Sequence, residues 1–207
     1  MKSKYESLFQ DYTFKSGVHV RNRLIMAPMT TFSADEHDYV SQEELDYYKE
    51  RSKGVGTVIT ACAYVSKNGK GFEGQMAIDR DDTNEGLSKL ADVIHEGGAK
   101  GIVQLYHGGR LAVPHLIPNG ETVSASAVAP LGDRGFYSIQ QTPRALTTEE
   151  VYELINDFGE ATRDRSQQDL TGLNCTEPRA IFYNNSFLRI PINEQMSFKI
   201  VTFSRLN

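Results

Sequence analysis

Short continuous apolar runs alternate with amphipathic stretches along the first 163 residues. The apolar runs cover 24–29, 57–65 and 101–106, and such runs are typical of strands that are buried on both faces. The stretches from Ser41, over 84–96 and from Thr148 carry apolar residues at helical spacing. Strand and helix recurring at intervals of about 40 residues predict βα units around a parallel sheet.

The expected helices carry their own start and stop signals. Ser41 and Glu44 form a capping-box pattern, and residues 147–150 (Thr-Thr-Glu-Glu) repeat it before the third helix. Gly54 follows the first helix, and Gly97 with Gly98 follows the second. A loop of about 40 residues separates the third strand from the third helix, which is too long for a plain connection.

A small hairpin is expected before the first strand. Residues 12–20 alternate around Ser16–Gly17, which favours a turn there. A hairpin in this place could plug the bottom of a (β/α)8 barrel. The predicted fold class is therefore α/β: a partial (β/α)8 TIM barrel of about the first three to four βα units.

The pattern ends near Asp164. Residues 164–207 show no helical or strand periodicity, and the helix from Thr148 leads into no readable fourth strand. The interpretation is a domain over 1–163, the N-terminal half of a barrel, followed by a tail over 164–207 that is expected to be poorly ordered.

Composition removes several function classes. With 22 Lys and Arg against 27 Asp and Glu, the net charge of −5 argues against a nucleic-acid binder. No apolar run approaches the length of about 18 residues that a membrane span needs. Two cysteines form no framework, so a reducing cytoplasm is the expected location.

Candidate chemistry lies where the expected strands end, because parallel barrels bind ligands at that edge. Small residues after the first two strands would let a flat ligand lie against the backbone, and the amide of Gln104 could pair with a heterocycle or be a satisfied core amide. His107 could be a base or a loop residue held by a hydrogen bond. No pair of histidines has metal-ligand spacing. Cys62 is interpreted as a packed thiol, and 79–82 as a solvated loop.

Five segments in order resemble the old yellow enzyme family of NADH-dependent flavin oxidoreductases, over residues 5 to 163. They are 22–30 (NRLIMAPMT), 50–56 (ERSKGVG), 59–63 (ITACA), 104–110 (QLYHGGR) and 157–163 (DFGEATR). The resemblance implies a (β/α)8 barrel that binds FMN, takes hydride from NAD(P)H and passes it to a small-molecule substrate, an activated alkene or similar acceptor. It also leaves room for a homo-oligomer.

Six positions match family residues that line the flavin: Ala27, Pro28, Met29, Thr30, Ala61 and Gln104. By the resemblance, Thr30 contacts the flavin near its C4 carbonyl, Ala61 offers a backbone contact, and Gln104 bonds the pyrimidine edge. Phe32 falls where relatives often place a substrate-side Tyr. No catalytic residue and no metal ligand is assigned in this chain.

The family continues with a fourth strand, a His pair that grips the substrate and a phosphate site, and none of these is readable after Arg163. A shifted reading of 165–178, with synonymous codons chosen to fit, gives IAAGFDGVELHGA. The same reading of 181–197 gives FLQQFFSPHSNQRTDE, although the codon spanning Pro178 and Arg179 cannot encode the expected residue. The hypothesis is that a frameshift near Asp164 replaced the rest of the enzyme.

Three functional interpretations remain open from the sequence. The first is an inactive N-terminal portion of a flavin oxidoreductase. The second is a working short flavoprotein completed by a partner chain or a second copy. The third is a non-catalytic interaction module that reuses half a barrel.

Overall fold

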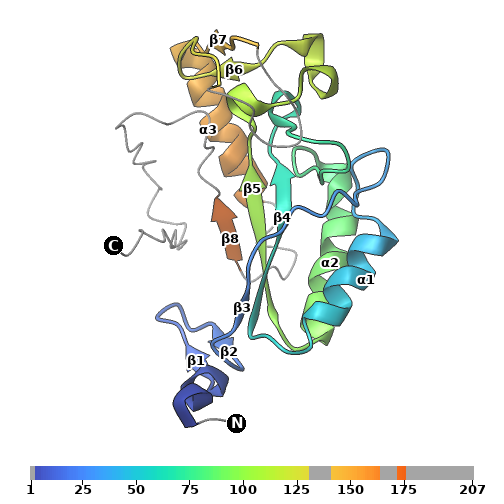
Figure 1. Ribbon diagram of the computed structural model, residues 1–207, viewed down its shortest axis with the longest axis vertical. Helices are drawn as coiled ribbons and strands as arrows, with labels where there is room; N and C mark the ends of the chain where they lie inside the picture. Colours follow the sequence, from blue (N-terminus) through green and yellow to red (C-terminus); the bar gives the residue numbers. More distant parts are fainter. Residues whose placement is uncertain (1–2, 131–140, 164–171, 176–207) are drawn as a thin grey trace.

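A four-stranded parallel sheet forms the centre of the protein (Figure 1). The structure is a computed structural model that describes residues 3–130, 141–163 and 172–175. The strands are β3 (Ile25–Met26), β4 (Thr57–Tyr64), β5 (Lys100–Tyr106) and β8 (Gly172–Cys175), in the order β3-β4-β5-β8. Every neighbouring pair is parallel, so the expected open α/β architecture of βα units is confirmed.

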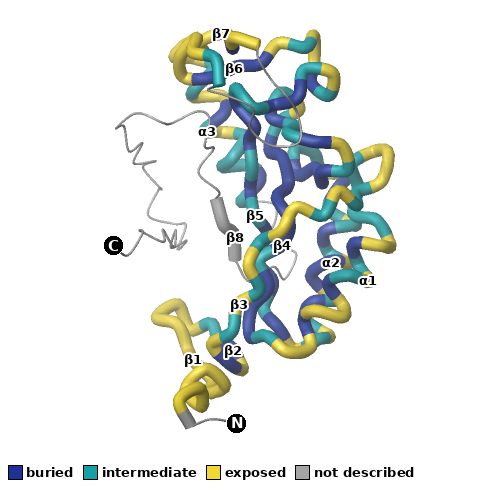
Figure 2. Tube along the Cα trace, in the orientation of Figure 1, coloured by how far each residue is buried: buried dark blue, intermediate teal, exposed yellow. Residues whose placement is uncertain are grey.

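Three helices lie against the sheet: α1 (Gln42–Arg51), α2 (Asn84–Glu96) and α3 (Thr148–Arg163). Helix α2 contacts both helix α1 and strand β5 (Figure 1). It buries Leu87, Leu90 and Ile94 at helical spacing in one cluster with Val103 and Leu105 of β5. Burial of these aliphatic side chains, about 1.5–3 kcal/mol each, is the main force that holds helices to sheet. The buried band between α2 and the sheet is visible in Figure 2.

The other face of β5 is less buried. Ile102, Gln104 and Tyr106 alternate with the core residues and are half-buried, as a period of two requires. In a closed barrel this face would point to the interior. In the described part of this chain no further strand packs against this face of β5.

Strand β4 contains a β-bulge. Its register to β5 runs Ile59 to Ile102 and then Cys62 to Gln104, so two residues, Thr60 and Ala61, stand where β5 has one. As a result Ile59 and Cys62 share one face although they are three residues apart. Both lie on the face of Gln104.

The N-terminal unit lies below the sheet, at the end where the strands begin (Figure 1). It consists of a 3-10 helix η1 (Ser3–Phe9) and the antiparallel hairpin of β1 (Tyr12–Thr13) and β2 (His19–Val20). Gly17 has a φ of +87° in the turn, which glycine adopts without a steric penalty. The hairpin is confirmed. The unit leaves a run of apolar side chains exposed: Tyr5, Leu8, Phe9, Tyr12 and Phe14.

Short elements fill the loops at the opposite end of the sheet. The loop after β4 contains η2 (Lys67–Gly69) and η3 (Asp81–Thr83). The long loop after β5 contains η4 (Gly109–Leu111), η5 (Pro114–Leu116), η6 (Pro118–Gly120) and the strand pair β6 (Val123–Ser124) and β7 (Arg144–Ala145).

The first strand covers Ile25–Met26, near the start of the apolar run over 24–29, so residues 27–30 follow the strand as expected. One expectation about the elements is corrected. The tail is not free of strand structure, because β8 pairs with β5 from Ile102↔Gly172 to Leu105↔Cys175. A strand that completes a sheet takes its stability from backbone pairing, which periodicity does not register. The remaining tail, 164–171 and 176–207, lies outside the described residues.

The two capping boxes differ. At α3, Thr147 and Glu150 exchange hydrogen bonds with each other's backbone N–H groups, as a complete capping box does. At α1, the Glu44 N–H donates to Ser41 Oγ at 3.1 Å, but the Glu44 side chain does not return to Ser41. It reaches the loop after β3 instead. No helix in the described residues has the length and apolar character for a membrane span.

Candidate functional site

The segment that follows β3 lies open at the carboxyl edge of the sheet. Ala27, Met29 and Thr30 are exposed, Met29 to 57%, and Pro28 is half-buried. An apolar side chain as exposed as Met29 at the end of a buried strand leaves a surface that a flat apolar group could cover.

Gln104 lies toward the same edge of the sheet on strand β5, which is separated from β3 by β4. Its backbone N–H donates to Thr60 Oγ1 at 3.4 Å, and its side chain stands beside Cys62 in the register. The half-buried amide makes no hydrogen bond with the described residues. The described residues therefore do not support the interpretation of Gln104 as a core amide whose hydrogen bonds are satisfied within the chain. An amide of this kind can both donate to and accept from a ligand.

Ala61 is held from behind by helix α1. Its N–H donates to the hydroxyl of Tyr48 at 2.6 Å, and its carbonyl accepts from Thr60 Oγ1 at 2.8 Å. Tyr48 is fully buried, so it supplies the partner that the bulge takes away from the β ladder. The sequence reasoning missed Tyr48, which carries no signal apart from its place on the inner face of α1.

Phe32 stands in a row of aromatic rings. Its ring centroid is 4.9 Å from that of Phe72, and the Phe72 ring is 6.5 Å from that of Tyr106, both in edge-to-face geometry. These three side chains come from the loop after β3, the loop after β4 and the end of β5. They form an aromatic wall beside the edge where Gln104 lies, and Phe72 and Tyr106 were not among the predicted site residues.

A buried carboxyl group ties the loop after β3 to α1. Glu44 is fully buried and accepts hydrogen bonds from the hydroxyls of Thr31, at 3.0 Å, and Ser33. Burial raises the pKa of the Glu44 carboxyl, and the bonds from Ser33 and Thr31 partly oppose that shift.

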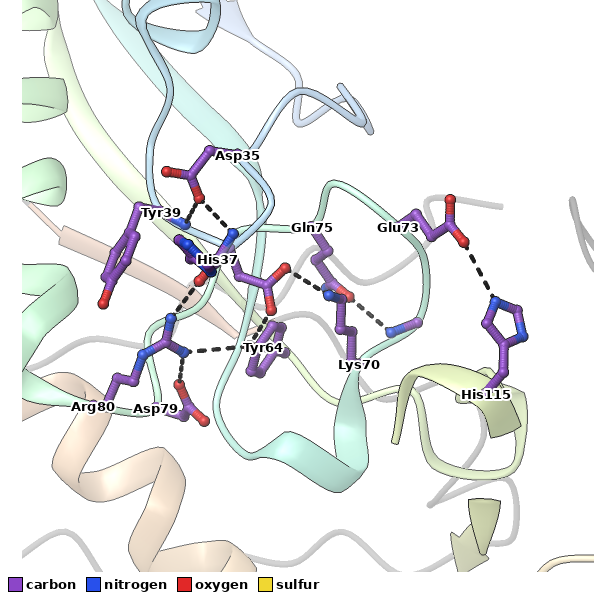
Figure 3. A network of polar contacts seen from close by, with 12 residues as sticks. Asp35, His37, Tyr39, Tyr64, Lys70, Glu73, Gln75, Asp79, Arg80 and His115 are labelled. Atoms are coloured by element: carbon purple, nitrogen blue, oxygen red, sulfur yellow. Dashed lines mark hydrogen bonds and ion pairs between the residues drawn. The ribbon is translucent and has the colours of Figure 1, made fainter. Parts of the chain in front are cut away.

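A polar network joins the loops at this edge (Figure 3). Lys70 Nζ lies 2.5 Å from Asp38, and both side chains are largely buried, at 14% and 15% exposure. The hydroxyl of Tyr64, at the end of β4, donates to the other Asp38 oxygen at 2.6 Å. Arg80 donates to the Tyr64 hydroxyl at 3.3 Å.

The arginine in this network corrects one expectation. Arg80 lies 2.9 Å from both Asp79 and Asp82, and the Asp79 side chain is only 6% exposed. Asp79 and Arg80 are thus part of the network, whereas Asp81 and Asp82 are exposed, as expected of a solvated loop. Alternating charges in a sequence do not reveal which of them a neighbouring loop will cover.

Known proteins share both the sequence and the fold of this chain. The model of the NADH:flavin oxidoreductase / NADH oxidase family matches residues 7–176. The chain belongs to this family. The match runs past residue 163 and takes in β8, so the family-like region extends farther than the resemblance at the sequence level indicated.

Among curated members of the family, the chain is similar to the probable NADH-dependent flavin oxidoreductase YqiG of Bacillus subtilis, with 44% identity over 173 residues. That match covers 84% of this chain and 45% of YqiG. It is 42% identical over 154 residues to the NADH:acrylate oxidoreductase of Vibrio harveyi, covering 74% of this chain and 15% of that protein. The chain thus spans less than half the length of these relatives.

Solved structures share the fold. Morphinone reductase in complex with tetrahydroNAD superposes with a TM-score of 0.74 at 24% identity, over 82% of this chain and 48% of that one. An old yellow enzyme homologue from Zymomonas mobilis superposes with a TM-score of 0.72 at 25% identity, again over 82% and 48%. The described sheet therefore corresponds to part of the family's barrel, and its four described strands do not close a barrel.

His107 has a structural role in this family member. Its Nε2 lies 3.0 Å from Asn68 Oδ1, and its Nδ1 accepts from the Gly109 N–H at 3.0 Å. Burial lowers the pKa of the imidazole to about 4. The ring is therefore neutral near pH 7, and the interpretation as a loop residue held by hydrogen bonds is confirmed.

Cys62 is a packed thiol, as expected. It is free and buried, and burial raises its pKa to about 11, so the reactive thiolate is scarce. Within the described residues no three His, Cys, Asp or Glu side chains are grouped as metal ligands.

Proposed function

We propose that this chain is the N-terminal half of an FMN-dependent oxidoreductase that takes hydride from NAD(P)H and passes it to an activated alkene or similar acceptor. We further propose that these 207 residues alone turn over no substrate. Family membership supports the flavin chemistry. The observation that carries the proposal is the half-buried Gln104 amide on β5, which lies across β4 from the open segment after β3 at the same edge of the sheet.

The residues at this edge fit the flat part of a flavin. The pyrimidine edge of the isoalloxazine ring alternates donors and acceptors, and the Gln104 amide can match both kinds. The residues that would hold the ring are those expected from the resemblance: Ala27, Pro28, Met29, Thr30, Ala61 and Gln104. Since the Ala61 N–H already donates to Tyr48, its backbone contact with the ring would be by packing or through the second lone pair of its carbonyl.

FMN supplies the two-electron hydride chemistry when bound, and the protein supplies orientation and electrostatics. Thr30 offers a hydroxyl to the ring near its C4 carbonyl. The aromatic wall of Phe32, Phe72 and Tyr106 would exclude water from the substrate side, which strengthens the polar contacts that orient the acceptor.

The part of the relatives that this chain does not match explains the proposed lack of turnover of these residues alone. By the resemblance, the phosphate site and the residues that grip the substrate belong to later strands, and the chain spans 45% of YqiG. The acrylate-reducing relative gives no guide to the substrate, because the match covers 15% of its length. A frameshift near Asp164 remains our proposal for the origin of the tail, and the match of the family model through residue 176 in the frame as given counts against a shift that early. A cytoplasmic location remains a prediction.

The test begins with the gene. Sequencing across the codons for 163–168 and about 600 bases beyond would show whether an open frame resumes with the IAAGFDGVELHGA strand. The 173 matched residues are 45% of YqiG, so about 200 further residues, or about 600 bases, are expected. The restored chain should purify yellow, with one FMN per chain, and oxidise NADH in the presence of an activated alkene. A gene with no family-like frame behind the tail would refute the frameshift.

The site is tested in the same restored chain with Gln104→Met, which keeps the side-chain volume and removes the amide. FMN affinity should fall about tenfold, the value of one or two hydrogen bonds. Gln42→Met, at an exposed position of α1, is the matched control and should bind FMN like the parent. Equal affinities in the two variants would remove Gln104 from the flavin site.

A second candidate rests on the open sheet. Among the described strands β3 and β8 form the two edges, and all four strands are parallel. A second copy related by a twofold axis along the barrel could pair β8 with β3 on both sides and give eight parallel strands. A yellow dimer of the 207-residue chain with stoichiometric flavin would favour this candidate over the inactive half.

A further inference from the structure

Phe32 has a backbone conformation that aromatic residues rarely adopt. Its φ is +55°, in the left-handed region, where the side chain of an L-residue crowds its own backbone. Such a conformation persists only where the surroundings determine it. The contacts around Phe32 therefore need a physical account.

Both neighbours of Phe32 are tied to one carboxyl group. The Thr31 hydroxyl donates to Oε1 of Glu44 at 3.0 Å, and the Ser33 hydroxyl donates to Oε2. The two bonds straddle Phe32 and come from opposite sides of it in sequence. They fix the chain on both sides of the residue whose φ is positive.

A third contact closes the turn from the other side. The Ala34 N–H donates to the Gly74 carbonyl at 3.0 Å. A Cβ atom at position 74 would overlap the Phe32 carbonyl, so this approach requires glycine. The loop after β4 thus packs directly on the backbone of Phe32.

Stability alone does not explain Glu44. Its carboxyl is fully buried, and within the described part of the chain it has hydroxyl partners and no paired cation. Removing a carboxylate from water is costly, and an apolar side chain of similar size commonly packs as well or better. The buried acid does give something an apolar residue cannot: two directional bonds to chosen hydroxyls.

We propose that Glu44 is a positioning residue that, through Thr31 and Ser33, holds Phe32 in its left-handed conformation and so fixes its ring in the aromatic wall. The two hydrogen bonds select one conformation of the turn, and the Gly74 carbonyl completes it. The use of this arrangement in catalysis rests on the proposed function, in which Phe32 faces the substrate.

The test uses Glu44→Gln in the 207-residue chain, with Glu43→Gln as the matched control. Glu43 is the exposed neighbour on the same helix, so both variants remove one negative charge from the first turn of α1. Hydrogen exchange followed by mass spectrometry at low protein concentration reports the Ala34 amide in a peptide over 30–36. We expect Glu44→Gln to speed exchange of this peptide about tenfold, while peptides of β4 and α2 keep the rate of the control.

A fluorescent reporter gives an independent reading. The chain contains no Trp, so Phe32→Trp places a single tryptophan in the aromatic wall. Adding Glu44→Gln should raise acrylamide quenching of this tryptophan about twofold, because the side chain would leave its packed position. Adding Glu43→Gln should leave quenching unchanged.

Two outcomes would overturn the positioning role. One is no local difference between the Glu44 and Glu43 variants. The other is faster exchange in every peptide together, which would show that Glu44 merely stabilises the whole fold. If Glu44→Gln does not fold, Thr31→Val removes one of the two bonds and is read by the same peptide with the same criteria. None of these measurements uses FMN, so they stand or fall separately from the proposed function.

Discussion

His107 shows how burial turns a titratable side chain into a pH-dependent stability element. Its folded-state pKa of about 4 lies below the unfolded value of 6.5. Above the unfolded value both states are neutral and the imidazole makes no difference. As the pH falls toward the folded value the unfolded state binds a proton that the native state refuses, so stability is lost.

The prediction concerns the pH dependence of unfolding. Between about pH 7 and about pH 5 the imidazole becomes protonated in the unfolded state only, and this should lower the free energy of unfolding of the parent chain by about 2 kcal/mol. His107→Gln, which stays neutral, should lack that loss, so the difference in stability between the two chains should shrink on acidification. Urea titrations at both pH values measure it.

The exposed His115, replaced by glutamine, is the control and should follow the parent curve. Parallel curves for the parent and His107→Gln would show that His107 titrates alike in both states. Other acidic groups, Glu44 included, contribute equally to parent and variant and cancel in the comparison.

The polar network of Asp38, Lys70 and Tyr64 joins the loop after β3 to the loop after β4. Asp38 belongs to the segment after β3 and has a φ of +67°, while Lys70 belongs to the loop after β4. Their ion pair, completed by Tyr64, links the carboxyl ends of the two strands. A largely buried pair that loses one partner leaves the other charge uncompensated.

Asp38→Asn should therefore destabilise the chain by about 2 kcal/mol. Asparagine tolerates the left-handed conformation, so the change removes charge without straining the turn. Glu50→Gln breaks the exposed pair with Lys53 and should leave the denaturant midpoint close to that of the parent. Denaturant midpoints of the two variants decide the matter, and equal midpoints would mean that the Asp38 pair is no stronger than a surface pair.

Elements with strong periodicity were predictable from the sequence. The second helix was expected over 84–96 and covers Asn84–Glu96, because Leu87, Leu90 and Ile94 mark one face plainly. Strand β8 was not predictable, because its pairing partner is β5 and its own residues carry no pattern. The same holds for Arg80, whose partners come from three segments that only the fold brings together.

Site residues divide in the same way. Gln104 stands out in an apolar strand, and the structure places it half-buried on the less buried face of β5. Phe72, Tyr106 and Tyr48 went unnoticed because an aromatic residue among apolar ones reads as core. Their distinct roles arise from contacts over 13 residues or more, such as Tyr48 with Ala61.

At the scale of the whole molecule, the chain has an apolar surface that its described part does not cover. Ile25, Met29 and Phe32 are exposed around the sheet, and the N-terminal unit exposes Phe9 and Phe14. Such clusters mark surfaces that another part of a protein covers. In relatives more than half of the chain lies beyond the matched region.

The 207-residue chain should therefore bind the dye ANS. It should also unfold below about 50 °C, at the low end of the range of melting temperatures that is typical of mesophilic domains. The frame-restored chain is the control and should bind little dye. A purified 207-residue chain with normal yield, no dye binding and a higher melting temperature would contradict the half-barrel interpretation.

The bulge in β4 has a consequence for how this strand can vary. Because it adds one residue at Thr60–Ala61, it resets the inside–outside alternation halfway along the strand, and Cys62 faces inward where a regular strand would have turned Ala61 inward. Losing either Thr60 or Ala61 would remove the bulge and leave Cys62 and Tyr64 opposite Gln104 and Tyr106, as they are now. Losing a residue between the bulge and Tyr64 would instead turn Tyr64 to the other face and take its hydroxyl away from Asp38. The bulge is therefore the one place in β4 where the strand can lose a residue without turning the following side chains over.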